Sequence, residues 1–509
     1  MRSEARTRRG GVVAPSLVWA GTRAVLLLYV FKVFTVPGGM DITTDVSAIY
    51  HGWYAHLSAG AFPSGDVAWQ YPPGAALVIL APGLLTGPAA GGLSYASAFF
   101  VLACVADAAV LGMLLYAVRR RGSRARPQPG TRGGRRRAGV WAWVAGVPLL
   151  GPTAYARYDL MVTALAVAAL LAAARRPRWA GMLAGLGAMV KVWPALLLLG
   201  APRGRATRAA WLTAPATALL LAAGFAATMP GSLDFLTGQR GRGTEVESVG
   251  SLALHAARYF FGWDGQIVLR YGSMEFVGSG VWLVTDAAMV ATGACFGWLL
   301  LWRLRARTWS PGTMADAALA AVLVFVVTSR VLSPQYLIWL VGLAAVCLTL
   351  RAGRRALPSW LVLVATGLTQ VEFPVRFTDV VTGGGWGSVA LAARNALLVA
   401  AAVIACVQLW RSTVTEAPPG GTGQDSTVPA MRPPHQDARP AAAGAEAAQD
   451  EGAPHAGIPS EGAPHQGIRY EGAPHEAAPH GRAPHGIAPF SAREAGSRAG
   501  RSHSPATGR

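Results

Sequence analysis

The chain has 509 residues, of which 52% are hydrophobic and 14% are charged, and its mean hydropathy is +0.36. This composition excludes an ordinary soluble protein, in which about 25% of the residues are charged. The formal net charge of +20 would suit a nucleic-acid partner, but the arginines cluster between long apolar runs, as in the cytoplasmic loops of membrane proteins. We therefore expect a polytopic protein that contacts membrane lipids and binds no nucleic acid.

The first half of the chain contains four apolar runs long enough to be spans, at 16–34, 95–118, 139–155 and 158–174. Arginines precede the first run and no cleavage site follows it, so we expect an uncleaved span with a cytoplasmic N-terminus. The basic segment at 119–137 is expected inside, which places residues 35–94 outside. The apolar piece after Tyr71 is then predicted to be a short helix in the membrane interface.

The stretch at 179–200 has arginines on both flanks and Lys191 near its middle, which favours two half-helices that enter the membrane and return. Six further runs follow, at 209–229, 280–302, 313–329, 335–350, 357–372 and 386–410, with Arg303, Arg351, Arg354, Arg355 and Arg411 among their inner flanks. The expected fold is an all-α bundle of about twelve transmembrane passes with both termini in the cytoplasm.

Residues 412–509 differ abruptly from the rest, because they are rich in Ala, Gly, Pro and His and almost devoid of large apolar residues. Such a segment cannot bury a core. We expect a membrane domain over 1–411 and a disordered cytoplasmic tail over 412–509. The tail carries an imperfect Glu-Gly-Ala-Pro-His repeat, first seen at Glu451–His455, which is too flexible for a defined metal site.

Polar residues at a membrane are costly unless they have a partner or a function, so they mark a candidate site. They gather on the predicted outer side, where the first loop holds Asp41, Asp45 and Asp66 among aromatic residues. A lipid-linked phosphosugar would place its phosphate against arginine, its sugar against aromatic rings and the acceptor hydroxyl near a carboxylate that acts as general base. The alternative interpretation of the three aspartates is a solvated loop.

Two cations also stand out. Arg330 is predicted to lie outside, against the positive-inside tendency, and is interpreted either as a phosphate clamp or as an anchor to lipid head groups. Lys191 must either pair with a carboxylate such as Asp107 or Asp159, or contact the substrate.

A weaker candidate for a functional cluster consists of Glu245, Glu247 and His255. We interpret these three as ordinary loop residues.

Four short motifs follow one another along the chain: Asp45–Tyr50 with Gly60 and Tyr71-Pro72-Pro73, Arg157-Tyr158-Asp159-Leu160, Lys191-Val192-Trp193-Pro194, and Ser333–Leu340. In this order they resemble the polyprenol-phosphate-mannose-dependent mannosyltransferases of glycosyltransferase family 87, which are C-class membrane glycosyltransferases. The resemblance covers most of residues 16–410.

The resemblance implies a C-class glycosyltransferase-like bundle with interfacial helices in the first outer loop. It implies a metal-independent, inverting transfer without a cofactor, in which a loop-one aspartate is the base. By position that aspartate is Asp45, with Asp41 as the alternative. The expected substrate-binding residues are Tyr71, Arg157, Tyr158, Asp159, Lys191, Arg330 and Gln335.

The leading hypothesis is a glycosyltransferase that moves a sugar, with mannose expected, from a polyprenyl phosphate to a lipid or glycan acceptor at the outer face of the plasma membrane. The alternative is a transporter or lipid-linked sugar flippase, which should show inverted repeats and charges near the midplane of several helices. No internal repeat is visible in the apolar runs, and most candidate polar residues lie on one side, which favours the enzyme. A third hypothesis is a non-catalytic partner that has lost the loop-one carboxylate.

Overall fold

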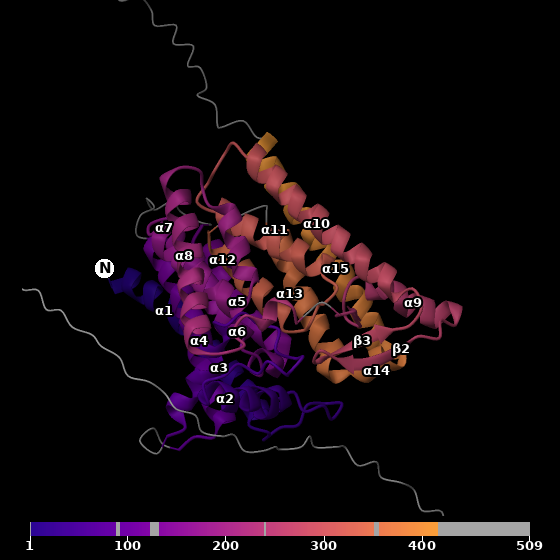
Figure 1. Cartoon of the computed structure of the whole chain (residues 1–509). Helices are drawn as coiled ribbons and strands as arrows, with labels where there is room; N and C mark the ends of the chain where they lie inside the picture. Colours follow the sequence, from indigo (N-terminus) through magenta and orange to yellow (C-terminus); the bar gives the residue numbers. More distant parts are fainter. Residues whose placement is uncertain (1, 88–91, 123–131, 239–240, 351–355, 416–509) are drawn as a thin grey trace, which may run out of the picture. The chain divides into compact units, whose positions relative to one another are not determined.

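The computed structural model describes residues 2–87, 92–122, 132–238, 241–350 and 356–415. They form a bundle of helices with a small sheet at one end (Figure 1). The middle of the predicted basic loop (123–131), the arginines at 351–355 and the predicted tail from 416 onward lie outside the described residues. The tail therefore stays a prediction.

The predicted spans correspond to ten helices among the described residues: α1 (Arg2–Val30), α4 (Tyr95–Gly122), α5 (Arg132–Leu150), α6 (Asp159–Ala173), α8 (Arg205–Thr228), α10 (Val281–Arg305), α11 (Thr313–Thr328), α12 (Tyr336–Leu350), α13 (Leu357–Gln370) and α15 (Gly385–Trp410). Within the described chain, five helices are long and apolar enough to cross a membrane alone: α1, α4, α8, α10 and α15. The protein is thus a mostly helical, multi-pass membrane protein. The count of about twelve passes stays a prediction.

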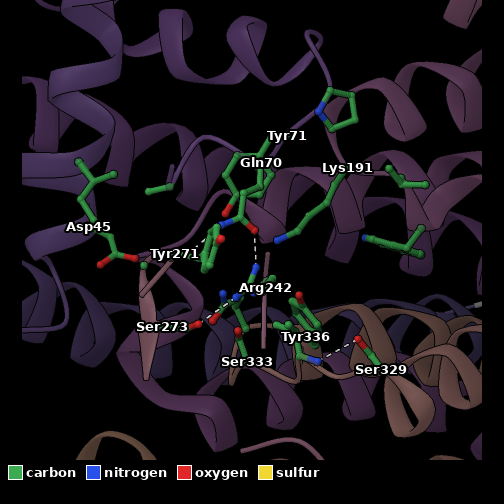
Figure 2. A pocket seen from close by; sticks show the side chains of 18 of the residues that line it. Asp45, Gln70, Tyr71, Lys191, Arg242, Tyr271, Ser273, Ser329, Ser333 and Tyr336 are labelled. Atoms are coloured by element: carbon green, nitrogen blue, oxygen red, sulfur yellow. Dashed lines mark hydrogen bonds between the residues drawn. The ribbon is translucent and has the colours of Figure 1, made fainter. Parts of the chain in front are cut away.

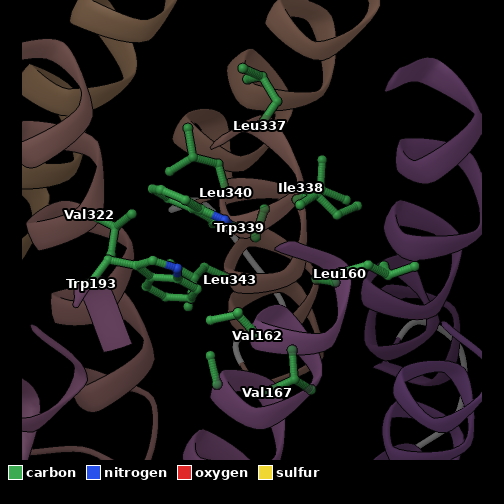
Figure 3. Packing of buried hydrophobic residues seen from close by; sticks show 14 of the residues in the cluster. Leu160, Val162, Val167, Trp193, Val322, Leu337, Ile338, Trp339, Leu340 and Leu343 are labelled. Atoms are coloured by element: carbon green, nitrogen blue, oxygen red, sulfur yellow. The ribbon is translucent and has the colours of Figure 1, made fainter. Parts of the chain in front are cut away.

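Helix α12 occupies the core because it is apolar on every side, which is the pattern of a fully surrounded helix. Every residue from Leu337 to Thr349 is buried, and Trp339, Leu340 and Leu343 pack against side chains of α6, α11 and the segment after α7 (Figure 3). Small residues permit the close packing expected of membrane helices. A Cβ on Gly342 would lie 2.3 Å from Cγ2 of Thr163 in α6.

The predicted half-helices are α7 (Pro177–Val190) and η5 (Trp193–Gly200), and the helix breaks at Lys191 as expected. Helix α7 packs tightly on α8 because glycines face it. A Cβ on Gly181 would lie 2.4 Å from the carbonyl oxygen of Ala210, and one on Gly185 would lie 2.3 Å from that of Ala214.

A polar cluster around Asp107 ties α1, α4 and α5 together inside the bundle. The Asp107 carboxylate is fully buried and accepts hydrogen bonds from Nε of Arg23 (2.6 Å), Nε1 of Trp143 (2.7 Å), Oη of Tyr155 (2.7 Å) and Nε1 of Trp19 (3.0 Å). Asp107 is therefore paired with Arg23, and Lys191 has another partner.

The loop predicted to be the first outer one contains short helices at the positions that the sequence predicted for the membrane interface. They are η1 (Asp45–Tyr50), α2 (His51–Ser58), α3 (Ala75–Leu80) and η2 (Ala81–Leu85). The apolar piece after Tyr71 is thus α3 and η2, which are together too short to span a bilayer core of about 30 Å.

The all-α prediction is wrong in the segment after α8. Following the short turn η6 (Asp234–Leu236), this segment holds an antiparallel sheet of order β1-β3-β2, made of β1 (Thr244–Glu245), β2 (Gln266–Arg270) and β3 (Ser273–Val277), with α9 (Ser251–Phe261) between β1 and β2. The β2–β3 hairpin closes at Tyr271 and Gly272, which have φ of 51° and 72°. Two positive φ values in a two-residue loop match the twist of the strands.

The remaining short elements are η4 (Gly151–Ala154), η7 (Val371–Val375), α14 (Phe377–Thr382) and η8 (Arg411–Thr415). The last of these begins at the predicted domain boundary and is packed on the bundle. Thr413 in η8 is buried, its Oγ1 accepts a hydrogen bond from Nε1 of Trp302 (2.9 Å), and its carbonyl oxygen accepts one from the N–H of Arg307 (2.8 Å). The packed part of the chain therefore continues to Thr415.

Segments predicted on opposite sides lie at opposite ends of the bundle. Helix α10 starts just after the sheet and its 25 residues rise about 37 Å. Near its end, Nη2 of Arg203 donates to the carbonyl oxygen of Arg303 (2.8 Å). At the sheet end, Nε2 of Gln70 in the predicted first outer loop donates to the carbonyl oxygen of Tyr271 (3.0 Å). Which end faces the cytoplasm stays a prediction.

Candidate active site

A cavity of about 350 Å³ lies at the sheet end of the bundle (Figure 2). Its walls come from η1, the segment before α3, the break between α7 and η5, the β2–β3 turn and the segment between α11 and α12. Of the site residues predicted from the sequence, it is lined by Asp45, Tyr71, Lys191, Arg330 and Gln335. Arg157, Tyr158 and Asp159 contact these residues from behind the wall, and Asp41 lies outside the lining.

Asp45 is the first residue of η1, so its carboxylate sits at the edge of the cavity. Its Oδ2 lies 3.0 Å from Nη2 of Arg157, and its side chain is 35% exposed. Arg157 is itself fixed, because its Nη1 donates to the carbonyl oxygens of Ile42 (3.1 Å) and Ala156 (2.8 Å). The arginine therefore holds the carboxylate in one place while leaving it open to a ligand.

The other two loop-one aspartates are committed to local structure. Asp41 accepts from Nζ of Lys32 (2.8 Å) and from N–H (2.9 Å) and Oγ1 (2.6 Å) of Thr43. Burial raises the pKa of Asp41, but these hydrogen bonds outweigh it and lower the pKa to about 2. Asp66 accepts from Nε1 of Trp53 (2.7 Å) and from the N–H of Ala68 (2.8 Å). Geometry thus favours Asp45 over Asp41.

Lys191 lies in an aromatic cage at the helix break. Its Nζ is 2.6 Å from Oδ1 of Asp159, which also accepts from Nε1 of Trp339 (2.7 Å). The same Nζ lies 5.0–5.4 Å from the ring centroids of Tyr71, Tyr158, Tyr336 and Trp339. Carboxylate and ring faces both stabilise a cation in a dry site. Of the two carboxylates proposed for Lys191, Asp159 is its partner.

Arg242 faces the cavity from the segment just before β1, and the sequence reasoning missed it. Its Nε lies 3.2 Å from Oε1 of Glu275, its Nη2 donates to Oγ of Ser273 (2.9 Å), and its Nη1 donates to Oε1 of Gln70. The residue could have been found by the test that singled out Arg330, since arginine asymmetry also predicts that residues 230–278 lie outside.

Arg330 lies in the turn after α11, with its Nη1 3.9 Å from Sδ of Met289. Burial, and then the like charge of Arg242, lower the pKa of Arg330 from its ordinary value. An arginine nevertheless stays protonated at neutral pH. Two guanidinium groups that repel each other beside one cavity form a site suited to an anion.

The interpretation of Glu245, Glu247 and His255 as ordinary loop residues is wrong, because all three are engaged inside the fold. Glu245 accepts from the N–H of Leu332 (2.6 Å) and Oγ of Ser333 (3.0 Å), which fixes the turn that carries Arg330. His255 Nε2 lies 2.8 Å from the carbonyl oxygen of Val246.

Glu247 belongs to a different buried group. It shares Nη1 of Arg394 with Glu372, at 3.3 Å and 3.0 Å respectively. Two carboxylates thus face one guanidinium where side-chain exposure is 5% or less.

Potential metal ligands do not gather in the described part of the chain, where no three His, Cys, Asp or Glu side chains could hold one ion together. Metal independence stays a prediction.

Comparison with known proteins places these residues in a family context. The profile of Glycosyltransferase family 87 matches residues 69–334, more than half of the chain. The chain belongs to glycosyltransferase family 87. The matched region contains Tyr71, Lys191, Arg242 and Arg330, whereas Asp45 precedes it. As a family 87 member the protein is a membrane glycosyltransferase, so the transporter hypothesis is not supported.

Among solved structures, this family 87 chain is similar to ArnT from Cupriavidus metallidurans, whose crystal structure is described as bound to undecaprenyl phosphate. The two chains share 14% sequence identity over 79% of this chain and 77% of that chain, with a TM-score of 0.38. This value does not establish a common fold. A search of curated proteins finds no match.

Proposed function

We propose that the protein transfers a hexose, with a preference for mannose, from a polyprenyl phosphate to a hydroxyl of a lipid or glycan acceptor at the outer face of the plasma membrane. One observation carries the proposal: a single cavity holds an accessible carboxylate, Asp45, together with the cations Lys191 and Arg242 (Figure 2) and Arg330. A general base and an anion site are what transfer from a phosphate-activated sugar requires.

In this mechanism Asp45 accepts the proton of the acceptor hydroxyl as its oxygen attacks the anomeric carbon. The bond from that carbon to the phosphate oxygen breaks, and the lipid phosphate leaves with the electron pair. Attack opposite to the leaving group inverts the anomeric centre. The salt bridge from Arg157 orients the Asp45 carboxylate toward the cavity before the proton moves.

Arg242 and Arg330 suit the leaving phosphate. Their guanidinium groups present several donors in a plane, and Glu275 and Gln70 hold Arg242 in position. Lys191 lies 2.6 Å from Asp159 at the helix break, and we assign it to the cavity floor, where it adds positive potential beside the two arginines.

Aromatic rings suit the sugar. Tyr336 and Trp339 stack with ring centroids 4.1 Å apart, and both line the cavity with Tyr71. Tyr71 and Tyr336 are only partly buried, and their apolar, electron-rich faces resemble the rings that commonly receive the C–H face of a hexose. By contrast, Trp339 is 1% exposed and also stacks with Trp193.

The assay uses purified full-length protein in vesicles with radiolabelled mannosyl farnesyl phosphate and a lipid extract of the source membrane as acceptor. We expect label to enter the extract, and glucosyl and galactosyl farnesyl phosphates to give less. Transfer from nucleotide-activated mannose but not from the prenyl donor would overturn the proposed donor class. Equal transfer of all three hexoses would refute the preference for mannose.

Orientation is tested separately in intact cells with a membrane-impermeant maleimide. A cysteine at Asp264, exposed between α9 and β2, should be labelled, and one at Arg305, exposed at the end of α10, should require permeabilisation. The reverse pattern would place the cavity on the cytoplasmic side.

A further inference from the structure

A second hollow of about 700 Å³ lies between α9 and the start of α15 and shares no lining residue with the candidate active site. Helix α9 lines it with Leu252, His255, Ala256, Tyr259 and Phe260, and α15 lines it with Gly385, Ser388, Val389, Leu391, Ala392 and Ala393. Its volume falls in the range of about 300–1,000 Å³ that is typical of small-molecule sites.

The chemistry of the lining points to hydrocarbon. Two polar side chains of the groove already contact backbone carbonyl groups: Nε2 of His255 lies 2.8 Å from the oxygen of Val246, and Oγ of Ser388 donates to that of Gly384 (2.9 Å). Most of the remaining lining residues are aliphatic, aromatic or glycine. A sugar or phosphate would lose water here and gain few hydrogen bonds, whereas an acyl chain would lose nothing.

The position of the groove brings it to membrane depth. Its α15 wall belongs to a candidate span that begins at Gly385, and Trp386 next to it is 73% exposed. At the start of α10, Trp282 is 64% exposed. Exposed tryptophans at the ends of spans mark the boundary between hydrocarbon and water. Val389, one turn further into the bilayer, is 56% exposed on the rim of the groove.

The other wall continues the same apolar surface. Helix α9 buries Leu254 toward the bundle, but its last three residues, Tyr259, Phe260 and Phe261, are 67–83% exposed. A helix with an apolar face that protein does not cover, next to the exposed ends of spans, matches helices that lie in the membrane interface. The surface that would contact the bilayer therefore runs unbroken from α15 through the groove to the tip of α9.

We propose that this groove binds an acyl chain of a bilayer phospholipid, with the aromatic tip of α9 in the interface of the same leaflet. The site is distinct from the donor cavity and does not depend on the transfer reaction. Its effect on the enzyme is mechanical: α9 leads directly into β2 and β3, whose turn places Tyr271 and Ser273 in the cavity wall. A lipid bound behind α9 would hold that wall against the membrane.

The test reconstitutes the full chain in vesicles that contain a phosphatidylglycerol with a photoreactive diazirine on one acyl chain. After irradiation, peptide mass spectrometry should find cross-links at 252–260 and 388–393, and excess unlabelled lipid should compete for them. Ala256→Trp fills the groove and should lower cross-linking there by about tenfold, the effect of about 1.4 kcal/mol of lost binding energy. Ala287→Trp, at an exposed position of α10 outside the groove, should leave it unchanged.

Ala392→Trp provides a second filling variant in case Ala256→Trp does not fold, since Ala392 is exposed and lines the groove from α15. The proposal is overturned if folded filling variants cross-link at the groove as strongly as the parent. It is equally overturned if groove labelling is not competed and only matches that of the lipid-facing Leu219 and Leu220 on α8, which are 68% and 75% exposed.

Discussion

Two ion-pair clusters in this bundle use the same kinds of residue for different purposes. Around Asp107 an arginine, two tryptophans and a tyrosine donate hydrogen bonds to one carboxylate. The side chains of Asp107 and of its ion-pair partner Arg23 are at most 2% exposed. Around Asp45 the carboxylate has one arginine partner and is 35% exposed to a cavity. Because the Asp107 carboxylate is buried and fully hydrogen-bonded, its cluster has a structural role. The Asp45 carboxylate has unused hydrogen-bond acceptor sites and can therefore bind a ligand.

The sharpest way to break this comparison is to neutralise each carboxylate in turn. Asp45→Asn preserves shape but removes the base, so turnover should fall by about 10²–10⁴ while the thermal midpoint hardly changes. Asp41→Asn is the matched control and should keep near-parental turnover. Loss of turnover in the Asp41 variant alone would transfer the role of base to Asp41, and full turnover in both would refute the proposed base.

The opposite pattern is expected for Asp107. In Asp107→Ala the buried guanidinium of Arg23 loses its counter-charge, which typically costs about 3–5 kcal/mol. Tryptophan fluorescence during heating should show a clearly lower midpoint, whereas Asp286→Asn, at an exposed position of α10, should not. If the Asp107 variant kept parental stability but lost turnover, the cluster would be functional.

A smaller effect is expected for the two arginines of the cavity. Arg242→Lys and Arg330→Lys keep the charge but lose the planar fork, so the KM for the donor should rise by about tenfold each while kcat changes less. Arg258→Lys is the control, since Nη1 of Arg258 donates to the carbonyl oxygen of Val381 and Arg258 does not line the cavity. An unchanged KM in both cavity variants would return Arg330 to the role of a lipid anchor.

The buried cluster of Glu247, Glu372 and Arg394 extends the comparison, because its contribution to stability depends on pH. Burial, and then the charge of Glu372, raise the pKa of Glu247 well above its ordinary value. The folded state then binds a proton more tightly than the unfolded state, so this contribution is full below about pH 4.5 and is lost as pH rises toward the folded-state pKa. Glu247→Gln should flatten the decline of the thermal midpoint as pH rises above about 4.5. An identical pH dependence in parent and variant would contradict it.

The smallest effect is expected from the predicted tail. Truncation after Thr415 keeps η8 and its contacts with Trp302 and Arg307, so expression and turnover should match the full chain. Truncation after Arg411 removes Thr413 and should lower the thermal midpoint. Loss of turnover in the longer truncation variant would show that residues 416–509 take part in the reaction.

The helices could be predicted because membrane spans are recognisable in the sequence as long apolar runs. Helix α12 was expected at 335–350 and lies at Tyr336–Leu350. The break at Lys191 was visible for the same reason, since a cation and a proline interrupt an apolar run. These signals are local, so they need no knowledge of which helices pack together.

The site was predictable only where a residue is unusual for its position. Lys191 and Arg330 met that condition, whereas the preference for Asp45 over Asp41 came from the family resemblance, and the choice of Asp159 as partner for Lys191 required the fold. Glu245 escaped because its partner Ser333 lies 88 residues away, and Glu247 because Arg394 lies 147 residues away. The sheet was not predicted because strands of two to five residues are too short to show a clear alternation of polar and apolar residues.

The glycine-lined contact between α7 and α8 also bears on how the chain enters the membrane during synthesis. Helix α7 has 14 residues and is about 21 Å long, too short to cross a hydrocarbon core of about 30 Å. It cannot leave the translocation channel as an independent span, and the charge of Lys191 at its tip opposes entry into lipid alone. The close contacts of Gly181 and Gly185 with α8 would solve this problem, because the predicted re-entrant hairpin can partition together with the helix that follows it. The floor of the candidate active site would then be completed only after α8 has emerged, which makes it a late product of biogenesis.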